Sequence, residues 1–408
     1  MRFHVLGLDH LPTLYEITSC AFTQKNLKLL KMLLSKGHDV IFYCAEGSER
    51  NIRFGNSAEA NTHGNLELVE AASKQLCIET YGEYDWKKEH FRTAPLDGKA
   101  NKSRETFNRN CIEHINSIKK DDDFLLCTQG TWHKPIASEV NLKLTCESGI
   151  GYRGVFADIR VFESYAWMHT IYGIFAGSGN NKFEDGQWWD AVIPNAFEID
   201  EFPFVQTPGR TKPLEQNGET YEDYYLYIGR ITQRKGVELV IQLAEQTGKK
   251  IIVAGQGGIE QDLFRTSVPE NLISLGAVGA EDRATLMGNA HAVLMPTYYI
   301  EPFGGVNVEA QLCGTPVITT DWGVFNETVQ HGVTGYRCRI FEEFKFAMEL
   351  AKGLDRKKIR QWAQTNYSTE RIADMYDHYF NMLHCYSQEG GWYTKKDMTD
   401  LDWLIRHY

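Results

Sequence analysis

Apolar runs and helical patterns alternate near the N-terminus. Phe3 to Leu8 is a short apolar run suited to a buried strand, and Cys20 to Ser35 then carries apolar residues at helical spacing. Gly37 ends this helical pattern, and Asp39 to Cys44 resumes a strand. A strand–helix–strand order of this kind is typical of a parallel sheet covered by helices.

The rest of the first half is less regular. Two further strands are predicted at 123–128 and 141–146, with a helix at 135–139 between them. Residues 45–110 are polar and interrupted by glycines, which predicts long loops and less regular helices. The run from Phe162 to Tyr172 is helical in pattern and rich in aromatic residues, and we expect most of it to pack in the core.

The alternation is clearest in the second half. The stretch 202–224 has prolines, glycines and many charges but no period, so we interpret it as a linker or a long surface loop. After it, strands are predicted at 225–228, 250–254, 272–275, 292–295 and 316–319. Helices are predicted at 237–246, 258–266, 281–287, after Phe303 and near 324–330. The chain is therefore expected to be α/β, with two doubly wound halves and a site in the cleft at the carboxyl ends of their strands.

Composition narrows the class of protein. A chain of 408 residues exceeds one ordinary core, which favours two domains, and 42% hydrophobic with 24% charged residues is typical of soluble globular proteins. No apolar run has membrane-spanning length, and the N-terminus is interpreted as a first strand and not as a signal peptide. The nine cysteines form no C-x-x-C pair, so we expect reduced thiols in a cytoplasmic protein. A net charge of −11 argues against nucleic acid or a strongly anionic membrane as partner.

The most informative segment is E-P-F-G-G-V-N-V-E, from Glu301 to Glu309. It follows an apolar run that ends at Pro296, so it is predicted to leave a strand, turn at the glycines and start a helix. Free N–H groups and the helix dipole make such a helix start an anion site. The two glutamates flank it at on the order of 10 Å, given ~1.5 Å per helical residue. That span suggests a clamp for a nucleotide sugar.

A basic segment follows the first strand of the second half. In G-R-I-T-Q-R-K-G, at 229–236, Arg230 stands at the strand's carboxyl end and Lys235 at the entry to the next helix. Both could bind one diphosphate, Arg230 by forked hydrogen bonds and Lys235 as a point charge. A solvated basic loop is the alternative interpretation. The nearby A-G-Q-G-G at 254–258 lacks the third glycine of a dinucleotide fingerprint, so we interpret it as a tight strand-to-helix turn.

The first half offers several candidate side chains. Glu147 leaves the end of the strand predicted at 141–146, where it either faces the cleft or stabilises a turn. His10 and Thr13 leave the first strand in the same manner, and His133 follows another strand. The acidic triplet 121–123 precedes a strand and is expected to be a solvated turn. The histidines have no metal-ligand spacing, so no metal site is predicted.

These motifs together resemble a known family. G-R-x4-K-G at 229–236, A-G-x-G at 254–257, E-P-F-G-G-x3-E-A at 301–310 and C-G-T-P-V-I-T-T-D at 313–321 resemble those of the retaining glycosyltransferases of family 4. I-P-N-A-F-E-x-D-E-F at 193–202 and G-H-D-V at 37–40 extend the resemblance into the first half. It implies the GT-B fold, in which two Rossmann-like domains face each other across a cleft. The acceptor-side domain would be 1–201, the donor-binding domain 202–370, and the segment from about 371 to 408 would pack back on the first domain.

The resemblance also implies roles for residues of the second half. Arg230 and Lys235 would hold the donor diphosphate, and Glu301 would bind sugar hydroxyls. The backbone N–H groups of Phe303, Gly304 and Gly305 would cradle the β-phosphate, Glu309 would take the ribose hydroxyls, and the loop at Val278 would meet the base. On the acceptor side the candidates are His10, Thr13 and His133. The family needs no metal or cofactor, because the nucleotide sugar is a co-substrate.

The chain departs from the family at three places. The glycine pair of the first loop is replaced by L-D-H-L-P-T, the family's D-x-G-G becomes D-W-G-V at 321–324, and Glu147 stands where many members have a histidine of the sugar site. The sequence thus predicts a cytoplasmic, retaining, metal-independent hexosyltransferase with a UDP- or GDP-linked donor. Its acceptor would be a glycan, a lipid-linked intermediate or a small molecule, and peripheral membrane contact is compatible with this. A sugar-nucleotide epimerase, a phosphorylase and a non-catalytic sugar-nucleotide-binding module are the alternatives.

Overall fold

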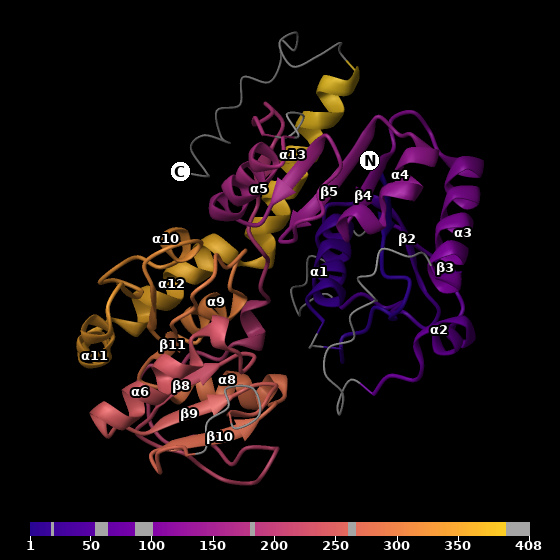
Figure 1. Ribbon diagram of the computed structural model, residues 1–408. Coiled ribbons are helices and arrows are strands. Elements are labelled where there is room, and N and C mark those ends of the chain that lie inside the picture. The colour runs from indigo at the N-terminus through magenta and orange to yellow at the C-terminus, as the bar shows by residue number, and fades with distance from the viewer. Residues whose placement is uncertain (18–19, 54–63, 86–100, 180–183, 260–266, 389–408) are drawn as a thin grey trace. The chain divides into compact units, whose positions relative to one another are not determined.

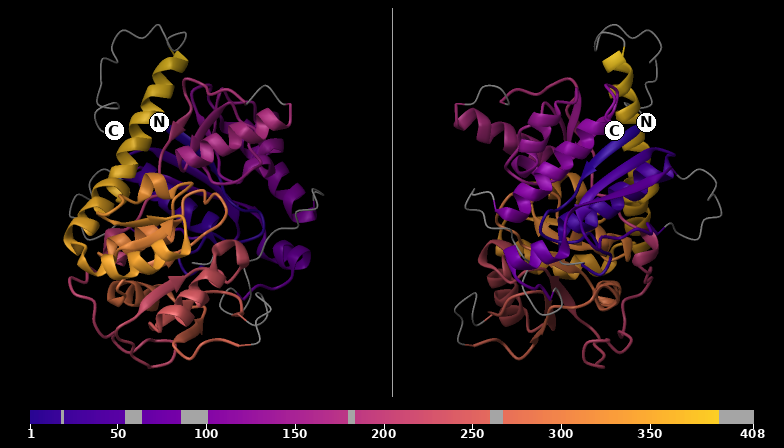
Figure 2. Two further views of the ribbon diagram at one scale, coloured as in Figure 1. Left: turned by 60° about the vertical axis from the view of Figure 1, so that its left-hand side comes forward. Right: turned by 90° about the vertical axis from the view of Figure 1, so that its right-hand side faces the viewer.

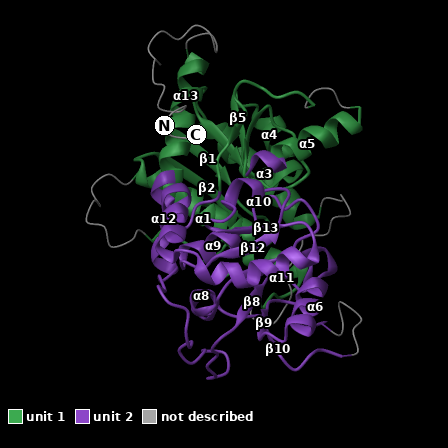
Figure 3. Cartoon of the chain, turned by 90° about the vertical axis from the view of Figure 1, so that its left-hand side faces the viewer, with its two compact units in different colours: residues 1–163, 168–194, 372–408 green, residues 164–167, 195–371 purple. Residues whose placement is uncertain are grey.

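The chain folds into two compact units (Figures 1 and 3). The structure is a computed structural model that describes residues 1–17, 20–53, 64–85, 101–179, 184–259 and 267–388. Unit 1 comprises Met1–Glu163, Met168–Pro194 and Ile372–Tyr408, and unit 2 comprises Ser164–Trp167 and Asn195–Arg371.

Unit 1 is built on a seven-stranded parallel sheet with the order β3-β2-β1-β4-β5-β6-β7. Its strands are β1 (Arg2–Leu6), β2 (Asp39–Ala45), β3 (Leu66–Ala72), β4 (Phe124–Cys127), β5 (Leu144–Ile150), β6 (Ile159–Phe162) and β7 (Ala191–Val192). Its helices are α1 (Ala21–Ser35), α2 (Lys74–Tyr81), α3 (Lys102–Ile118), α4 (Lys134–Val140), α5 (Tyr165–Gly177) and α13 (Thr369–Gln388). The last two begin in unit 2 and continue in unit 1.

Both faces of this sheet are buried. Leu6, Ile41 and Leu125 belong to a core cluster that includes residues of α3 and α4. On β1 and β4, Phe3 and Phe124 instead meet Phe380 of α13, with ring centroids 5.0 Å and 5.3 Å away. Figure 2 shows α13, in yellow, beside the indigo strands of this sheet. The C-terminal helix is therefore part of the core of unit 1.

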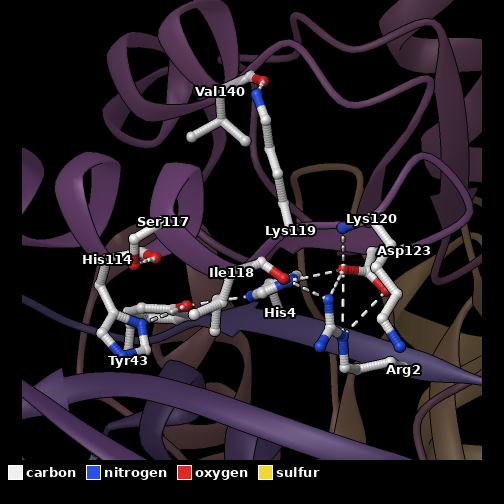
Figure 4. Close-up of polar contacts among 10 residues, drawn as sticks. All are labelled: Arg2, His4, Tyr43, His114, Ser117, Ile118, Lys119, Lys120, Asp123 and Val140. Carbon is white, nitrogen blue, oxygen red and sulfur yellow. Dashed lines mark hydrogen bonds and ion pairs between the residues drawn. The ribbon is translucent and has the colours of Figure 1, made fainter.

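A polar network ties the amino ends of β1 and β4 together (Figure 4). The Asp123 carboxylate accepts a hydrogen bond from Arg2 Nε at 3.0 Å and lies 3.1 Å from His4 Nε2. Burial alone would raise the pKa of Asp123, but the hydrogen bonds from Arg2, the Lys120 N–H and His4 outweigh it, and the pKa is lowered. The expected solvated turn is right for Asp121 and Asp122, which are exposed, and wrong for Asp123, which is buried.

Unit 2 has a six-stranded parallel sheet with the order β10-β9-β8-β11-β12-β13. Its strands are β8 (Tyr225–Ile228), β9 (Ile251–Ala254), β10 (Leu272–Gly276), β11 (Val293–Met295), β12 (Val317–Thr320) and β13 (Gly335–Cys338). Its helices are α6 (Val237–Thr247), α8 (Ala280–Asn289), α9 (Gly305–Leu312), α10 (Phe325–Thr328), α11 (Phe341–Leu350) and α12 (Arg356–Tyr367). Neighbouring residues of one strand enter different cores: Leu226 lies in one cluster and Tyr227 in the other. The doubly wound α/β expectation is confirmed.

The predicted helices and strands agree with the structure better in the second half of the chain than in the first. Each of the five strands predicted between 225 and 319 is present within a residue or two. The predicted helix at 258–266 lies mostly outside the described residues. For 45–110, long loops and less regular helices were predicted; α2 and the start of α3 agree with the helices, whereas the strand β3 was not predicted. The stretch 202–224 contains no helix or strand, yet Leu214 and Tyr221 are buried in the core of unit 2.

Each sheet has one point at which the strand order reverses. In unit 1 this switch point lies between β1 and β4, and in unit 2 it lies between β8 and β11. The loops that follow the two central strands diverge there, so ligands of open α/β sheets bind at this place. Among the described residues, no helix is both long enough and apolar enough to cross a membrane.

Candidate donor site in unit 2

The loop after β8 is shaped by close backbone packing. Gly236 has φ 76° and caps α6, and a Cβ there would lie 1.9 Å from the Pro296 carbonyl oxygen. A Cβ on Gly255 would lie 1.8 Å from the Gly229 carbonyl oxygen, so the loops after β8 and β9 touch backbone to backbone. Gly236 and Gly255 therefore have a packing reason. For 254–258 this supports the tight turn expected from the sequence.

Lys235 and Glu301 meet at the switch point of unit 2. Lys235 ends the loop after β8, and Glu301 lies in the loop after β11. Lys235 Nζ donates to Glu301 Oε2 at 2.6 Å, and the two side chains are 21% and 11% exposed. The two charges thus neutralise each other at a site that is only partly exposed to water. Arg230, at the end of β8, is exposed and has no ion pair among the described residues.

Tyr299 supports this pair, and nothing in the sequence analysis singled it out. Lys235 Nζ lies 5.2 Å from the centre of the Tyr299 ring, and the Arg234 guanidinium lies 4.0 Å from it. Burial raises the pKa of Tyr299, and the neighbouring Glu301 charge raises it further. The phenol therefore stays neutral beneath two cations. Its only sequence signal was an aromatic residue two positions before Glu301.

The start of α9 presents free backbone donors. Gly304, with φ 71°, is the N-cap residue and has no side chain to cap the helix. The N–H groups of Phe303, Gly304 and Gly305 have no hydrogen-bond acceptor among the described residues. These donors and the helix dipole favour an anion at this point.

Side chains behind the helix start hold it in place. The Phe303 ring is 2% exposed and packs on Phe197, with ring centroids 6.0 Å apart. Ser164 Oγ donates to the Pro302 carbonyl at 2.6 Å. Asn307 Nδ2 donates to the Gly304 carbonyl and to Thr328 Oγ1. The donors are thus fixed before any ligand arrives, which lowers the cost of binding.

Glu309 and Val278 lie in the kinds of element that the sequence predicted, a helix and the loop after a strand. Glu309 is inside α9, and its Oε2 is 3.4 Å from Arg283 Nε of α8, beyond a good hydrogen bond. Val278 follows β10 and packs partly against a core cluster of unit 2. The loop at Gly276 reaches the same edge, because its carbonyl accepts the Gly255 N–H at 2.7 Å. The segments that follow β8, β10 and β11 therefore carry all the donor-site candidates except Glu309, which lies inside α9.

Glu147 does not lie where the sequence analysis expected it. β5 runs to Ile150, so Glu147 is inside the strand and is fully buried, not at its end. Its Oε2 accepts the N–H groups of Phe156 and Ala157 at 2.7 Å and 2.8 Å, and its Oε1 accepts the Tyr152 hydroxyl. Burial raises the pKa of Glu147 to about 7 against these hydrogen bonds. Of the two roles that the sequence left open, the contacts match the turn-stabilising one.

The acceptor-side candidates surround the switch point of unit 1. His133 Nδ1 accepts the Thr128 N–H, and its Nε2 donates to the Gly7 carbonyl at 3.0 Å. Burial lowers the pKa of His133 to about 4, so it is a neutral link between the loops after β1 and β4. The Thr13 N–H donates to Ser48 Oγ, and its buried hydroxyl has no partner among the described residues. His10 pairs with Asp9.

The fold is similar to that of glycosyltransferases of known structure. Across nearly the whole chain the structure is similar to AviGT4, a glycosyltransferase of avilamycin A biosynthesis, with 19% identity, TM-score 0.63 and coverage of 94% of this chain and 98% of that one. It is also similar to Anabaena HepE in complex with UDP-glucose, with 15% identity, TM-score 0.58 and coverage of 93% and 99%. At these identities the likeness concerns the fold, which is that of the GT-B glycosyltransferases, as predicted.

The sequence of unit 2 is similar to a family of glycosyltransferases. Residues 211–368 match the model of Glycosyl transferases group 1, which is similarity over the part of the chain that carries the motifs from 229 to 321. An uncharacterized glycosyltransferase of Methanocaldococcus jannaschii is 31% identical over 167 residues, which are 39% of this chain and 41% of that protein. A glycogen synthase of Mycobacterium tuberculosis is 30% identical over 156 residues, or 36% and 35% of the two chains. The chain thus aligns with well under half the length of these curated relatives.

Proposed function

We propose that the protein is a glycosyltransferase that moves a hexosyl unit from a nucleoside-diphosphate sugar, UDP- or GDP-linked, to a hydroxyl group. The observation that carries the proposal is the set of backbone N–H donors at Phe303, Gly304 and Gly305, which have no acceptor among the described residues, with Lys235 and Glu301 beside them. A diphosphate supplies the oxygens that these donors lack. The similarity of residues 211–368 to group 1 glycosyltransferases supports the same substrate class.

The chemistry follows from the charges at this edge. The bond between the sugar's anomeric carbon and the β-phosphate oxygen breaks, and a bond from that carbon to the acceptor oxygen forms. The departing diphosphate gains negative charge, which Lys235, Arg230 and the start of α9 stabilise. The acceptor's hydroxyl proton leaves with the diphosphate. The anomeric configuration is retained in this proposal, and the nucleotide sugar is a co-substrate, with no metal or cofactor required.

The two glutamates have different parts in this proposal. When a diphosphate takes Lys235, the Glu301 carboxylate loses its partner and accepts hydrogen bonds from the hydroxyls of the donor sugar. Glu309 accepts the ribose hydroxyls, since it is a carboxylate about one turn into α9 and only weakly paired with Arg283. Val278 lines the region of the base. The acceptor is a glycan, a lipid-linked intermediate or a small molecule, and the setting is cytoplasmic.

A screen of nucleotides and of donor alone tests this function. UDP, GDP and ADP are added in a thermal-shift assay, and one of them is expected to raise the melting temperature by mass action. The matching nucleotide sugar is then incubated with and without methyl glycosides, and the products are followed by proton NMR. Transfer to a glycoside supports the proposal. An epimer formed from donor alone favours an epimerase, saturable binding without turnover favours a binding module, and pyridoxal absorbance favours a phosphorylase. No shift with any nucleotide contradicts the proposal.

A further inference from the structure

Helix α11 exposes two large apolar side chains on the surface of unit 2, and Figure 1 shows this helix at the outer edge of that unit. Phe346 is 72% exposed and Leu350 is 46% exposed, and the two lie one helical turn apart on the same face. The opposite face of α11 is buried, because Phe344, Ala347 and Met348 pack with α6 in a core cluster. Single exposed apolar residues are common, whereas an exposed aromatic–aliphatic pair on one helix face is a candidate contact surface.

Charged residues follow a regular order along one flank of this apolar face. They are Glu342, Lys345, Glu349 and Lys352, spaced by three, four and three residues. Residues at such spacings are neighbours on a helix surface. Lys345 Nζ lies 3.0 Å from the Glu342 carboxylate, and Lys352 Nζ lies 3.8 Å from the Glu349 carboxylate, so the four charges share one side of the helix. Their signs alternate along the helix, and the flank has no net charge.

This order of charges is complementary to itself when the helix is turned end to end. If two copies of α11 lie antiparallel about a two-fold axis midway between Lys345 and Glu349, Glu342 faces Lys352 of the second copy and Lys345 faces Glu349 of the second copy. The two-fold axis repeats both pairs, so all four positions meet the opposite sign. In a parallel pair the same positions would meet like charges. Flanking charges of this kind set the direction and the register of paired helices.

We propose that α11 is a homodimer interface, on which a second copy of this chain packs through the same helix in the antiparallel direction. Phe346 of each copy then packs against Phe346 and Leu350 of the other, because these side chains lie on either side of the position that it faces. Exposed ion pairs contribute little to affinity, so the apolar contact supplies the affinity and the charges supply the orientation. The balanced charge favours a protein partner over a membrane, because helices that bind membranes carry an excess of Lys and Arg on their polar face.

This surface of α11 lies away from the candidate donor site. Glu349 also forms an ion pair with Lys249, which closely precedes β9, so this end of α11 lies at the amino edge of the sheet. The donor-site candidates instead follow the carboxyl ends of β8, β10 and β11 or lie in α9. A dimer through α11 therefore leaves the donor edge of unit 2 open, and the proposal does not depend on the proposed function.

Sedimentation equilibrium of the full chain tests the proposal. A helix of 10 residues is about 15 Å long, so the interface is small and the dimer should dissociate on dilution. The average mass should rise from that of one chain towards twice that value as the concentration is raised to about 0.5 mM. Phe346→Ser should weaken the association at least about tenfold. Ile78→Ser is the matched control, because Ile78 is an exposed apolar residue on α2 of unit 1, and it should leave the association unchanged.

Two charge reversals test the two-fold geometry. Lys345→Glu brings like charges together at two places in the dimer, and so does Glu349→Lys, so each variant alone should be monomeric. In an equal mixture of the two variants, each reversed position faces the opposite charge again, and a heterodimer should form. The double variant that carries both reversals should also recover the association of the parent. A general loss of folding would give neither recovery.

The proposal is overturned if the parent stays monomeric at that concentration, if Ile78→Ser weakens association as much as Phe346→Ser, or if the mixed charge variants stay monomeric. Binding of a monomeric parent to vesicles of phosphatidylcholine and phosphatidylglycerol, lost in Phe346→Ser, would overturn it in favour of a membrane contact. Binding of UDP, GDP and ADP should be equal in the parent and in all these variants. Its absence in the parent would contradict the proposed function and leave the homodimer standing.

Discussion

Glu301→Gln is expected to move nucleotide binding and sugar transfer in opposite directions. In the free protein Lys235 donates to Glu301 at 2.6 Å, and this pair must separate before Lys235 can bind a diphosphate. Glutamine keeps the size of the side chain and removes its charge. Lys235 is then available to the diphosphate at no electrostatic cost.

The expected changes in nucleotide affinity and in kcat/KM are estimated from the exposure of the Lys235–Glu301 pair. Side chains that are 21% and 11% exposed are neither free in water nor fully buried, so we take about 1 kcal/mol for the pair, the upper end for exposed ion pairs. Its removal should tighten binding of the nucleoside diphosphate about fivefold. Transfer loses hydrogen bonds between a charged group and the sugar, worth about 1.5–3 kcal/mol, so kcat/KM should fall about tenfold to a hundredfold.

Isothermal titration with UDP, GDP and ADP measures the first effect, and release of nucleotide from the donor sugar measures the second. Glu349→Gln is the matched control, because Glu349 forms an ion pair with Lys249, which precedes β9 at the opposite edge of the same sheet. That variant should change neither quantity. The reasoning is refuted if Glu301→Gln weakens nucleotide binding, or if it leaves transfer intact.

Three further predictions test the architecture. Gly236→Ala should abolish nucleotide binding, because a Cβ would lie 1.9 Å from the Pro296 carbonyl oxygen. The control Gly248→Ala, at φ 66° in open space, should cost only about 1–2 kcal/mol in the free energy of unfolding and should keep nucleotide binding. If a titration shows that both variants change nucleotide binding equally, this would argue against the close approach. The folded-state pKa of Glu147 is raised to about 7, so its contribution to stability is present below the unfolded-state value and is lost as pH rises towards 7. In urea unfolding from pH 5 to 8, Glu147→Gln should therefore gain on the parent as pH rises, and parallel curves would contradict this. Asp123→Asn should lower the free energy of unfolding by about 2–3 kcal/mol at pH 7. Because the pKa of Asp123 is lowered in the folded state, this difference between variant and parent should shrink below about pH 4. A difference that does not depend on pH would count against the network.

The second half of the chain was predictable because local pattern and fold agree there. Strands β8, β9 and β11 are fully buried, so they are continuous apolar runs, and a glycine directly follows β8 and β9. The motif from Glu301 to Gly305 correctly predicted a strand exit and a helix start. The fold then brings Glu301 and Lys235, which the sequence analysis assigned to one ligand, to the same switch point.

The first half was harder because its edge elements are only half-buried. Most of β3, at the edge of the sheet, is exposed or only partly buried, and α3 buries Phe107, Cys111 and Ile115 among many charges. Glu147 was misplaced because a carboxylate suggests the end of a strand, whereas here the loop at 156–157 supplies N–H groups to it inside β5. Tyr299 contacts Lys235, and Arg283 contacts Glu309, and no local spacing in the sequence shows either contact.

The central claim is that the edge of unit 2 carrying Lys235 and the start of α9 binds the nucleoside diphosphate, and titration of two lysine variants tests it most directly. Lys235→Ala removes one charge-assisted hydrogen bond to the ligand, worth about 1.5–3 kcal/mol, so the Kd for UDP, GDP or ADP, whichever the parent binds, should rise about tenfold to a hundredfold. Lys249→Ala removes the same kind of residue, also paired with a glutamate, from the opposite edge of the sheet, and its Kd should equal that of the parent. Equal Kd values for Lys235→Ala and the parent protein would contradict the account.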